Sequence, residues 1–255
     1  MGFKRHIPNT ITLLNLLCGI IAVIFALKGW QLFAIYLILI AAVMDYLDGF
    51  SARMLKAYSN LGKELDSLAD LVSFGLAPSL LIYYRFSTLL SPEINTGVNS
   101  VWIELLSFTP LIIALASALR LAIFNIDTRQ TESFIGVPTP ANAILISMFM
   151  HFTLYNSSMD SIYNNFWFFP LLSLLLSYLL VCSVPMFSLK IKSLKYRENK
   201  RLFNFVLISA IILVPAIING SQWSLLVFIL FANYILFNSL IFIYEKLFLK
   251  PNRLN

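Results

Sequence analysis

The stretch DYLDGFSARMLKAYSNLGKELDSLAD, residues 45–70, contains five of the chain's 12 acidic residues. Four of them are aspartates in two helix-spaced pairs, Asp45 with Asp48 and Asp66 with Asp70. The chain on both sides of the stretch is strongly apolar, which places these carboxylates at a membrane boundary. Ionisable groups there are costly unless something compensates them, so the stretch is a candidate functional site.

The composition predicts an all-α integral membrane protein. Of the 255 residues, 59% are hydrophobic and 12% are charged, whereas an ordinary soluble domain is about 25% charged. The apolar residues lie in long blocks, as in membrane-spanning proteins. A net charge of +6 raises the alternative of nucleic-acid binding. We exclude it because the basic residues lie at the ends of apolar runs.

We expect eight transmembrane helices, since a span needs roughly 20 apolar residues. Their approximate bounds are 9–27, 31–47, 65–84, 105–124, 140–154, 166–186, 203–218 and 224–248. The expected division is a membrane core of six helices over residues 1–190, followed by a basic loop and two additional helices over residues 191–255.

The distribution of basic residues predicts the orientation. With a cytoplasmic N-terminus, all of the 18 Lys and Arg residues except Lys28 and Arg85 fall on the cytoplasmic side. This is a strong positive-inside bias. We therefore expect a multi-pass protein of the cell (inner) membrane with both termini and the acidic stretch in the cytoplasm.

Helical spacing places the first aspartate pair beside small residues. Asp45, Asp48, Gly49 and Ala52 share one helix face, and Arg53 lies at its edge. The small residues leave room for a bulky ligand close to the backbone.

The second aspartate pair has the same regularity. Gly62, Asp66 and Asp70 recur at four-residue spacing and form one face of the next helix. Because the connection between the two helices is short, we expect antiparallel neighbours whose four aspartates converge on one site.

Four converging carboxylates repel one another and need a counter-charge. Their oxygen atoms suit Mg²⁺ or Mn²⁺, and two divalent ions would neutralise all four. The sequence has no cluster of His or Cys, which argues against zinc or copper. Paired metal ions are typical of phosphoryl transfer. Asn9 and Thr12, near the same membrane face, are candidate ligand contacts.

One known signature matches this stretch. The CDP-alcohol phosphatidyltransferase family has a signature that resembles Asp45-x-x-Asp48-Gly49-x-x-Ala52-Arg53, eight residues, Gly62-x-x-x-Asp66-x-x-x-Asp70. The resemblance implies a six-helix core, two divalent metal ions, a CDP-linked lipid donor, displacement of CMP by an alcohol, and a homodimer. By position it implies metal binding by the four aspartates, a general-base role for Asp70, and contacts to the CDP group from Gly49, Ala52, Arg53, Gly62, Asn9 and Thr12.

Further stretches resemble the phosphatidylserine synthase branch of that family. They are IPNTITLLNLLCG (7–19), LDSLADLVSFGLAPSLLIY (65–83), RLAIFN (120–125) and FIGVPTPA (134–141). This resemblance implies CDP-diacylglycerol as donor and L-serine as acceptor. Arg120 is the candidate for serine's carboxylate because a guanidinium forks onto two oxygens. Asn125 and Thr139 are further candidates. One departure is Ile123, where branch members often carry a second basic residue.

Two alternative functions remain. The acceptor of the same reaction could be glycerol 3-phosphate or inositol phosphate, whose phosphate would require more than one cation in the pocket. A membrane cation transporter would instead use the aspartates as an ion pathway. It predicts acidic groups at mid-membrane depth rather than at a boundary.

Overall fold

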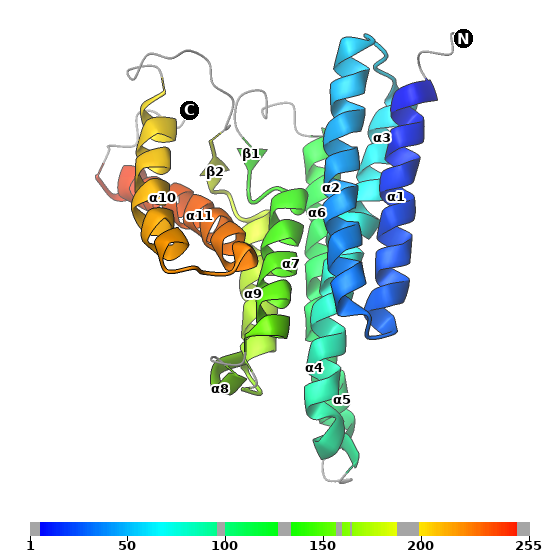
Figure 1. The fold of residues 1–255 in the computed structure, drawn as a ribbon. Coiled ribbons are helices and arrows are strands. Elements are labelled where there is room, and N and C mark those ends of the chain that lie inside the picture. The colour runs from blue at the N-terminus through cyan, green and yellow to red at the C-terminus, as the bar shows by residue number, and fades with distance from the viewer. Residues whose placement is uncertain are drawn as a thin grey trace.

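The computed structural model describes residues 6–95, 100–126, 134–156, 160–163, 165–187 and 199–248. Nearly all of the regular structure in these ranges is helical, which confirms the all-α prediction (Figure 1). The helical elements are α1 (His6–Leu27), α2 (Gln31–Met54), α3 (Asn60–Asp70), the π-helix η2 (Leu71–Leu76), α4 (Ala77–Asn95), α5 (Ser100–Ser107), the 3-10 turn η3 (Thr109–Leu111), α6 (Ile112–Ile126), α7 (Thr139–Tyr155), α8 (Asp160–Tyr163), α9 (Phe168–Val181), α10 (Lys200–Ile218) and α11 (Trp223–Phe248).

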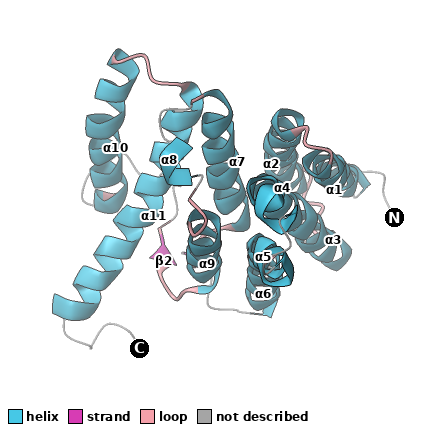
Figure 2. Ribbon diagram, turned by 90° about the horizontal axis from the view of Figure 1, so that it is seen from below, coloured by secondary structure: helices cyan, strands magenta, loops and turns pink. Residues whose placement is uncertain are grey.

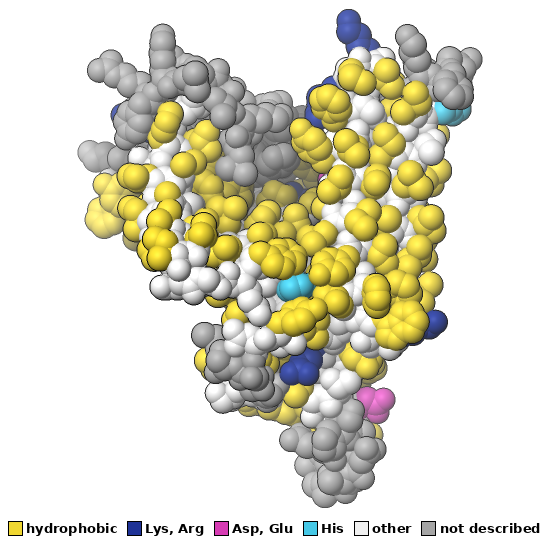
Figure 3. Space-filling view, in the orientation of Figure 1, with side chains coloured by type: hydrophobic (Ala, Val, Ile, Leu, Met, Phe, Trp, Pro, Cys, Tyr) yellow, Lys and Arg dark blue, Asp and Glu magenta, His cyan; other side chains and the backbone are white. Residues whose placement is uncertain are grey.

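Six helical stretches in the described ranges are long and apolar enough to cross a membrane. They are His6–Leu27, Gln31–Met54, Asn60–Leu90, Val101–Ile126, Lys200–Ile218 and Trp223–Phe248. Hydrophobic side chains cover much of the visible face over α1, α2 and α10 (Figure 3). The chain is therefore a multi-pass membrane protein.

The expectation of eight spans is only partly confirmed. At the positions of the fifth and sixth expected spans, α7 has 17 residues and α9 has 14. Both are shorter than the roughly 20 residues of a full span. Residues 188–198, which contain most of the expected basic loop, lie outside the described ranges.

The α1–α2 hairpin lies at one side of the molecule, and α10 and α11 lie at the other (Figures 1 and 2). A close backbone approach holds α1 against η2. A Cβ added at Gly19 would lie only 2.8 Å from Ser73 Cα, and Ser73 Oγ donates a hydrogen bond to the Asn15 carbonyl at 3.0 Å. Small residues commonly permit such contacts between membrane helices. They hold η2, which directly follows Asp70, beside α1.

A short strand pair was not expected from the sequence. β1 (Phe134–Ile135) pairs antiparallel with β2 (Pro185–Met186), so that Phe134 faces Met186 and Ile135 faces Pro185. The pair lies towards the same end of the helices as the C-terminus of α2 (Figure 1). It joins the segment before α7 to the segment after α9.

Candidate active site

The two halves of the acidic stretch are the end of α2 and the whole of α3, whose last residue is Asp70. The residues between them are 55–59, which confirms the short connection expected from the sequence. Ser59 has an extended backbone, and its Oγ accepts a hydrogen bond from the Gly62 N–H at 3.0 Å. This N-cap satisfies one of the free amide groups at the helix start. It fixes where α3 begins and hence where its aspartates point.

Three of the four aspartates form a compact group. Asp45, Asp48 and Asp66 each offer one oxygen, and these oxygens all lie within 4.8 Å of one another. Asp70 is not part of this group, but its buried carboxylate interacts electrostatically with all three. The convergence predicted from helical spacing is therefore present for Asp45, Asp48 and Asp66.

The donor atoms of this cluster fit divalent cations. Asp66 Oδ1 and Asp70 Oδ1 are buried and have no hydrogen-bond partner. Among the described residues, no Lys or Arg forms an ion pair with any of the four aspartates. Buried carboxylates without such partners are strongly destabilising. A hard cation with oxygen ligands would supply the missing charge.

A pocket of about 220 Å³ opens beside the carboxylates. Its walls come from three helices and one connection: Pro8, Asn9 and Thr12 of α1, Asp48, Gly49 and Ala52 of α2, Ala57, Tyr58 and Ser59 of the connection, and Gly62, Lys63 and Asp66 of α3. The helix α1 packs along both α2 and α3, which make few backbone contacts with each other. Thus α1 packs against both α2 and α3, and the pocket lies among these three helices and the connection.

The two polar residues predicted on α1 both reach this pocket. Thr12 is buried, and its Oγ1 donates a hydrogen bond to Asp48 Oδ2 at 2.7 Å. Asn9 faces Gly62, since a Cβ added at Gly62 would lie 3.0 Å from Asn9 Oδ1. Thr12 therefore orients an aspartate, whereas Asn9 leaves its carboxamide at the pocket wall.

Arg53 lies at the rim of the pocket. Its side chain is exposed and does not line the pocket, unlike Gly49 and Ala52. A Cβ added at Gly49 would lie 3.6 Å from an Arg53 guanidinium nitrogen, so the guanidinium lies over Gly49. The predicted site residues of α2 are thus neighbours, with the cation outermost.

The structure brings Arg120 of α6 to the acidic cluster. Arg120 is 7% exposed and interacts electrostatically with Asp70. It donates a long hydrogen bond of 3.4 Å to Thr139 Oγ1 at the start of α7, and its Nε has no hydrogen-bond partner. A buried guanidinium with unused donors next to a carboxylate can bind a small anionic group.

Other candidates take different places. The Asn125 carboxamide nitrogen donates to Ser67 Oγ at 2.9 Å, and Lys63 Nζ donates to the Asn125 carbonyl at 2.9 Å. Asn125 therefore ties the end of α6 to α3. Lys63, which the sequence indicates only as one of the basic residues on the cytoplasmic side, lines the pocket together with Tyr58 and Ser59, which were not predicted there. The position of Tyr58 and Ser59 in the sequence, between the two aspartate pairs, could have indicated that they lie at the pocket.

Comparisons with known proteins agree with this geometry. The model of the CDP-alcohol phosphatidyltransferase family matches residues 5–186, which span α1 through β2. Three similar proteins are each named CDP-diacylglycerol–serine O-phosphatidyltransferase. The protein of Mycobacterium leprae is 39% identical over 55% of this chain and 45% of its own length. The protein of Bacillus subtilis is 37% identical over 53% of this chain and 70% of its own length. The protein of Methanocaldococcus jannaschii is 31% identical over 89% of this chain and 91% of its own length. The match to the first thus spans less than half of that relative.

Proposed function

Because the chain belongs to the CDP-alcohol phosphatidyltransferase family, we propose that it transfers the phosphatidyl group of CDP-diacylglycerol to the hydroxyl of L-serine and releases CMP. The names of the relatives support serine as the acceptor. The observation that carries the proposal is the group of Asp45, Asp48 and Asp66 carboxylates, two of which line the pocket, together with the buried Arg120 that interacts electrostatically with Asp70. This arrangement offers an anion-binding cation beside a proton acceptor.

The pocket between α2 and α3 suits the CDP group of the donor. Gly49, Ala52 and Gly62 have little or no side chain, so a nucleotide can approach the backbone closely. Asn9 offers a hydrogen-bonding carboxamide, and Lys63 and Arg53 offer positive charge at the wall and the rim. These groups complement a ribose, a base and a pyrophosphate.

The four aspartates would hold two divalent ions, Mg²⁺ or Mn²⁺, with Asp45, Asp48 and Asp66 as the compact group and Asp70 as the adjoining ligand. When bound, such ions supply positive charge that stabilises the pyrophosphate and the leaving CMP. Thr12 donates a hydrogen bond to one oxygen of Asp48, which holds this carboxylate in place for an ion.

The chemical step needs a base and an orienting group. Serine's hydroxyl is a weak nucleophile at neutral pH, and Asp70 accepts its proton. Arg120 binds the serine carboxylate through its guanidinium, whose Nε has no hydrogen-bond partner in the structure, and this holds the hydroxyl near Asp70. The new bond joins the serine oxygen to the lipid-side phosphorus, the bond from that phosphorus to the bridging oxygen breaks, and CMP leaves with the electron pair.

The membrane arrangement follows from the position of the site. The start of α1, the end of α2 and the start of α3 lie at one end of the helices (Figure 1), and the positive-inside bias assigns that end to the cytoplasm of the cell (inner) membrane. The acyl chains of the donor stay in the bilayer while the nucleotide enters from the cytoplasm. If α7 and α9 also cross the membrane, the protein has eight spans. Six of them form the core of residues 1–190, and α10 and α11 are the two additional ones. We expect the protein to be a homodimer.

The test is an acceptor comparison on the purified protein. CMP release from CDP-diacylglycerol is measured with Mg²⁺ or Mn²⁺ and with serine, glycerol 3-phosphate or inositol phosphate in turn. We expect CMP release and phosphatidylserine formation with serine alone. Turnover with a phosphate-bearing acceptor instead of serine would refute the acceptor assignment, and ion flux without CMP release would refute the transferase.

A further inference from the structure

Two side chains of α11 bind both backbone polar groups of Phe187, the residue after β2. Tyr234 Oη donates to the Phe187 carbonyl at 2.7 Å, and the Phe187 N–H donates to Asn238 Oδ1 at 3.0 Å. The Asn238 amide nitrogen donates to the Tyr234 carbonyl at 2.7 Å, which fixes the orientation of the carboxamide. Both side chains are buried. Tyr234 and Asn238 are called the clamp below.

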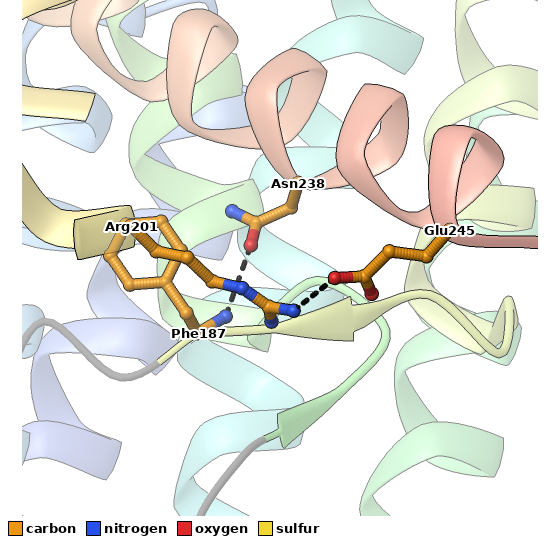
Figure 4. A network of polar contacts seen from close by, with 4 residues as sticks. All are labelled: Phe187, Arg201, Asn238 and Glu245. Carbon is orange, nitrogen blue, oxygen red and sulfur yellow. Dashed lines mark hydrogen bonds and ion pairs between the residues drawn. The ribbon is translucent and has the colours of Figure 1, made fainter. Parts of the chain in front are cut away.

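Aromatic and ionic contacts hold the clamp in place. The Phe187 ring packs against Tyr234 at 5.4 Å and against Phe205 of α10 at 5.8 Å between ring centroids. An ion pair between Arg201 and Glu245 joins α10 to α11 nearby (Figure 4). The hairpin of α10 and α11 therefore grips the end of β2 as one unit.

The strand pair connects β2, which the clamp holds, to the start of α7. β2 pairs with β1, and the next residues continue the attachment: Gly136 N–H donates to the Val184 carbonyl at 2.9 Å, and Val137 N–H donates to the Leu179 carbonyl at 3.0 Å. Gly136 has φ +74°, and a Cβ there would lie 2.4 Å from the Leu180 carbonyl oxygen. The segment before α7 thus has one tightly fitted path against the end of α9.

Two residues after Val137 comes Thr139, the residue that contacts Arg120. Thr139 is fully buried, and its Oγ1 accepts the 3.4 Å hydrogen bond from Arg120. A chain of contacts therefore runs from the clamp through Phe187, β2 and β1 to Thr139 and the guanidinium beside Asp70.

We infer that the clamp positions Arg120 for the acceptor, so that Tyr234 and Asn238 are positioning residues for acceptor binding. The inference rests on the proposed function, because it takes Arg120 as the group that binds the carboxylate of the acceptor. The family model ends at residue 186, so the clamp lies beyond the matched region. The α10–α11 hairpin then helps to position Arg120 in the core, in addition to anchoring the chain in the membrane.

Hydrogen bonds suit this role better than apolar packing alone. They are directional, so two of them on one peptide group allow only one placement of β2. In apolar surroundings an unpaired N–H or carbonyl costs free energy. Moving Phe187 away from Tyr234 and Asn238 would leave both of its backbone groups unpaired. A shift of about 1 Å in Thr139 would be enough to misplace a guanidinium that must form two short bonds to a carboxylate.

The test compares three variants of the full-length protein. Asn238→Ala removes the acceptor for the Phe187 N–H, and Tyr234→Phe removes only one hydroxyl and keeps the aromatic packing. Asn233→Ala is the matched control, because Asn233 of the same helix donates to Ser209 Oγ of α10 at 2.8 Å, and none of the described hydrogen bonds joins Asn233 to Phe187. The readouts are kcat, the KM for serine, the KM for CDP-diacylglycerol, and amide hydrogen exchange over residues 134–139 and 185–187.

We expect each clamp variant to raise the KM for serine about five- to tenfold. The KM for CDP-diacylglycerol and kcat should stay within about twofold of wild type, and exchange over both segments should be faster. Asn233→Ala should match wild type in all readouts. Equal changes in both KM values, a fall in kcat alone, or unchanged exchange in Tyr234→Phe would overturn the inference.

A double-mutant cycle tests whether the effect passes through Thr139. In a Thr139→Ala background the hydrogen bond to Arg120 is already lost, so Asn238→Ala should raise the KM for serine less than it does in wild type. Full additivity would overturn the proposed route. If the wild-type protein turned over no serine, the proposed function would fail. The clamp would then be tested by the exchange data and by the KM for the acceptor that is turned over.

Discussion

Replacing Thr12 with valine removes one hydroxyl and nearly conserves volume. In the structure Thr12 is 3% exposed, and its hydroxyl donates a 2.7 Å hydrogen bond to Asp48 Oδ2. A hydrogen bond to a charged group contributes about 1.5–3 kcal/mol. Loss of such an outer-shell contact typically weakens metal binding about 10- to 100-fold. We therefore expect Thr12→Val to raise the activating concentration of Mn²⁺ by that factor.

The assay is a Mn²⁺ titration of CMP release at saturating donor and serine. Thr10→Val is the matched control, since Thr10 is exposed on the same helix and donates only to the His6 carbonyl at 2.9 Å. Thr12→Ser keeps the hydroxyl and should restore the Mn²⁺ dependence to within about threefold of wild type. A wild-type Mn²⁺ curve for Thr12→Val would refute the orienting role of Thr12, and an equal effect of Thr10→Val would refute its specificity.

Three further substitutions test the remaining parts of the site. Asp70→Asn removes the proton acceptor and should lower kcat for CMP release at least about 100-fold at saturating Mn²⁺, so near wild-type turnover would contradict the base assignment. Arg120→Lys keeps the charge but loses the fork, and it should raise the KM for serine about tenfold or more; an unchanged KM would remove Arg120 from acceptor binding. Gly62→Ala places a Cβ 3.0 Å from Asn9 Oδ1 and should raise the KM for CDP-diacylglycerol, whereas Gly49→Ala, with 3.6 Å to its nearest neighbour, should change it less; the reverse order would show that the nucleotide lies elsewhere.

Regular helical spacing made the acidic cluster predictable. The faces of α2 and α3 follow from side-chain directions that every α-helix shares, so the convergence of Asp45, Asp48 and Asp66 needed only two helices and a short connection. The apolar runs likewise predicted the long helices. The bounds of α7 agree with the expected span 140–154 to within one residue, whereas the expected span 166–186 extends beyond α9 at both ends and includes β2.

Contacts between segments far apart in the sequence could not be predicted from the spacing of residues along one helix. Arg120 and Asp70 are 50 positions apart, and Arg120 contacts Thr139 at the start of α7, which follows the strand β1. Thr12 was expected to contact a ligand, but the packing of α1 turns it towards Asp48. The role of α1 as a bridge depends on the close approach of Gly19 to Ser73, a steric fit that becomes visible only when both helices are placed.

The sequence by itself therefore determined the membrane helices, the faces of the aspartates and the family. Each of these depends on residues within a few turns of one another, where the geometry of the helix decides which side chains are neighbours. The tertiary structure decided that α1 packs against both α2 and α3 beside the pocket, that Arg120 interacts electrostatically with Asp70, and that α11 binds the end of β2. These arrangements depend on packing and hydrogen bonds between segments far apart in the chain, and no local pattern specifies which segments will meet.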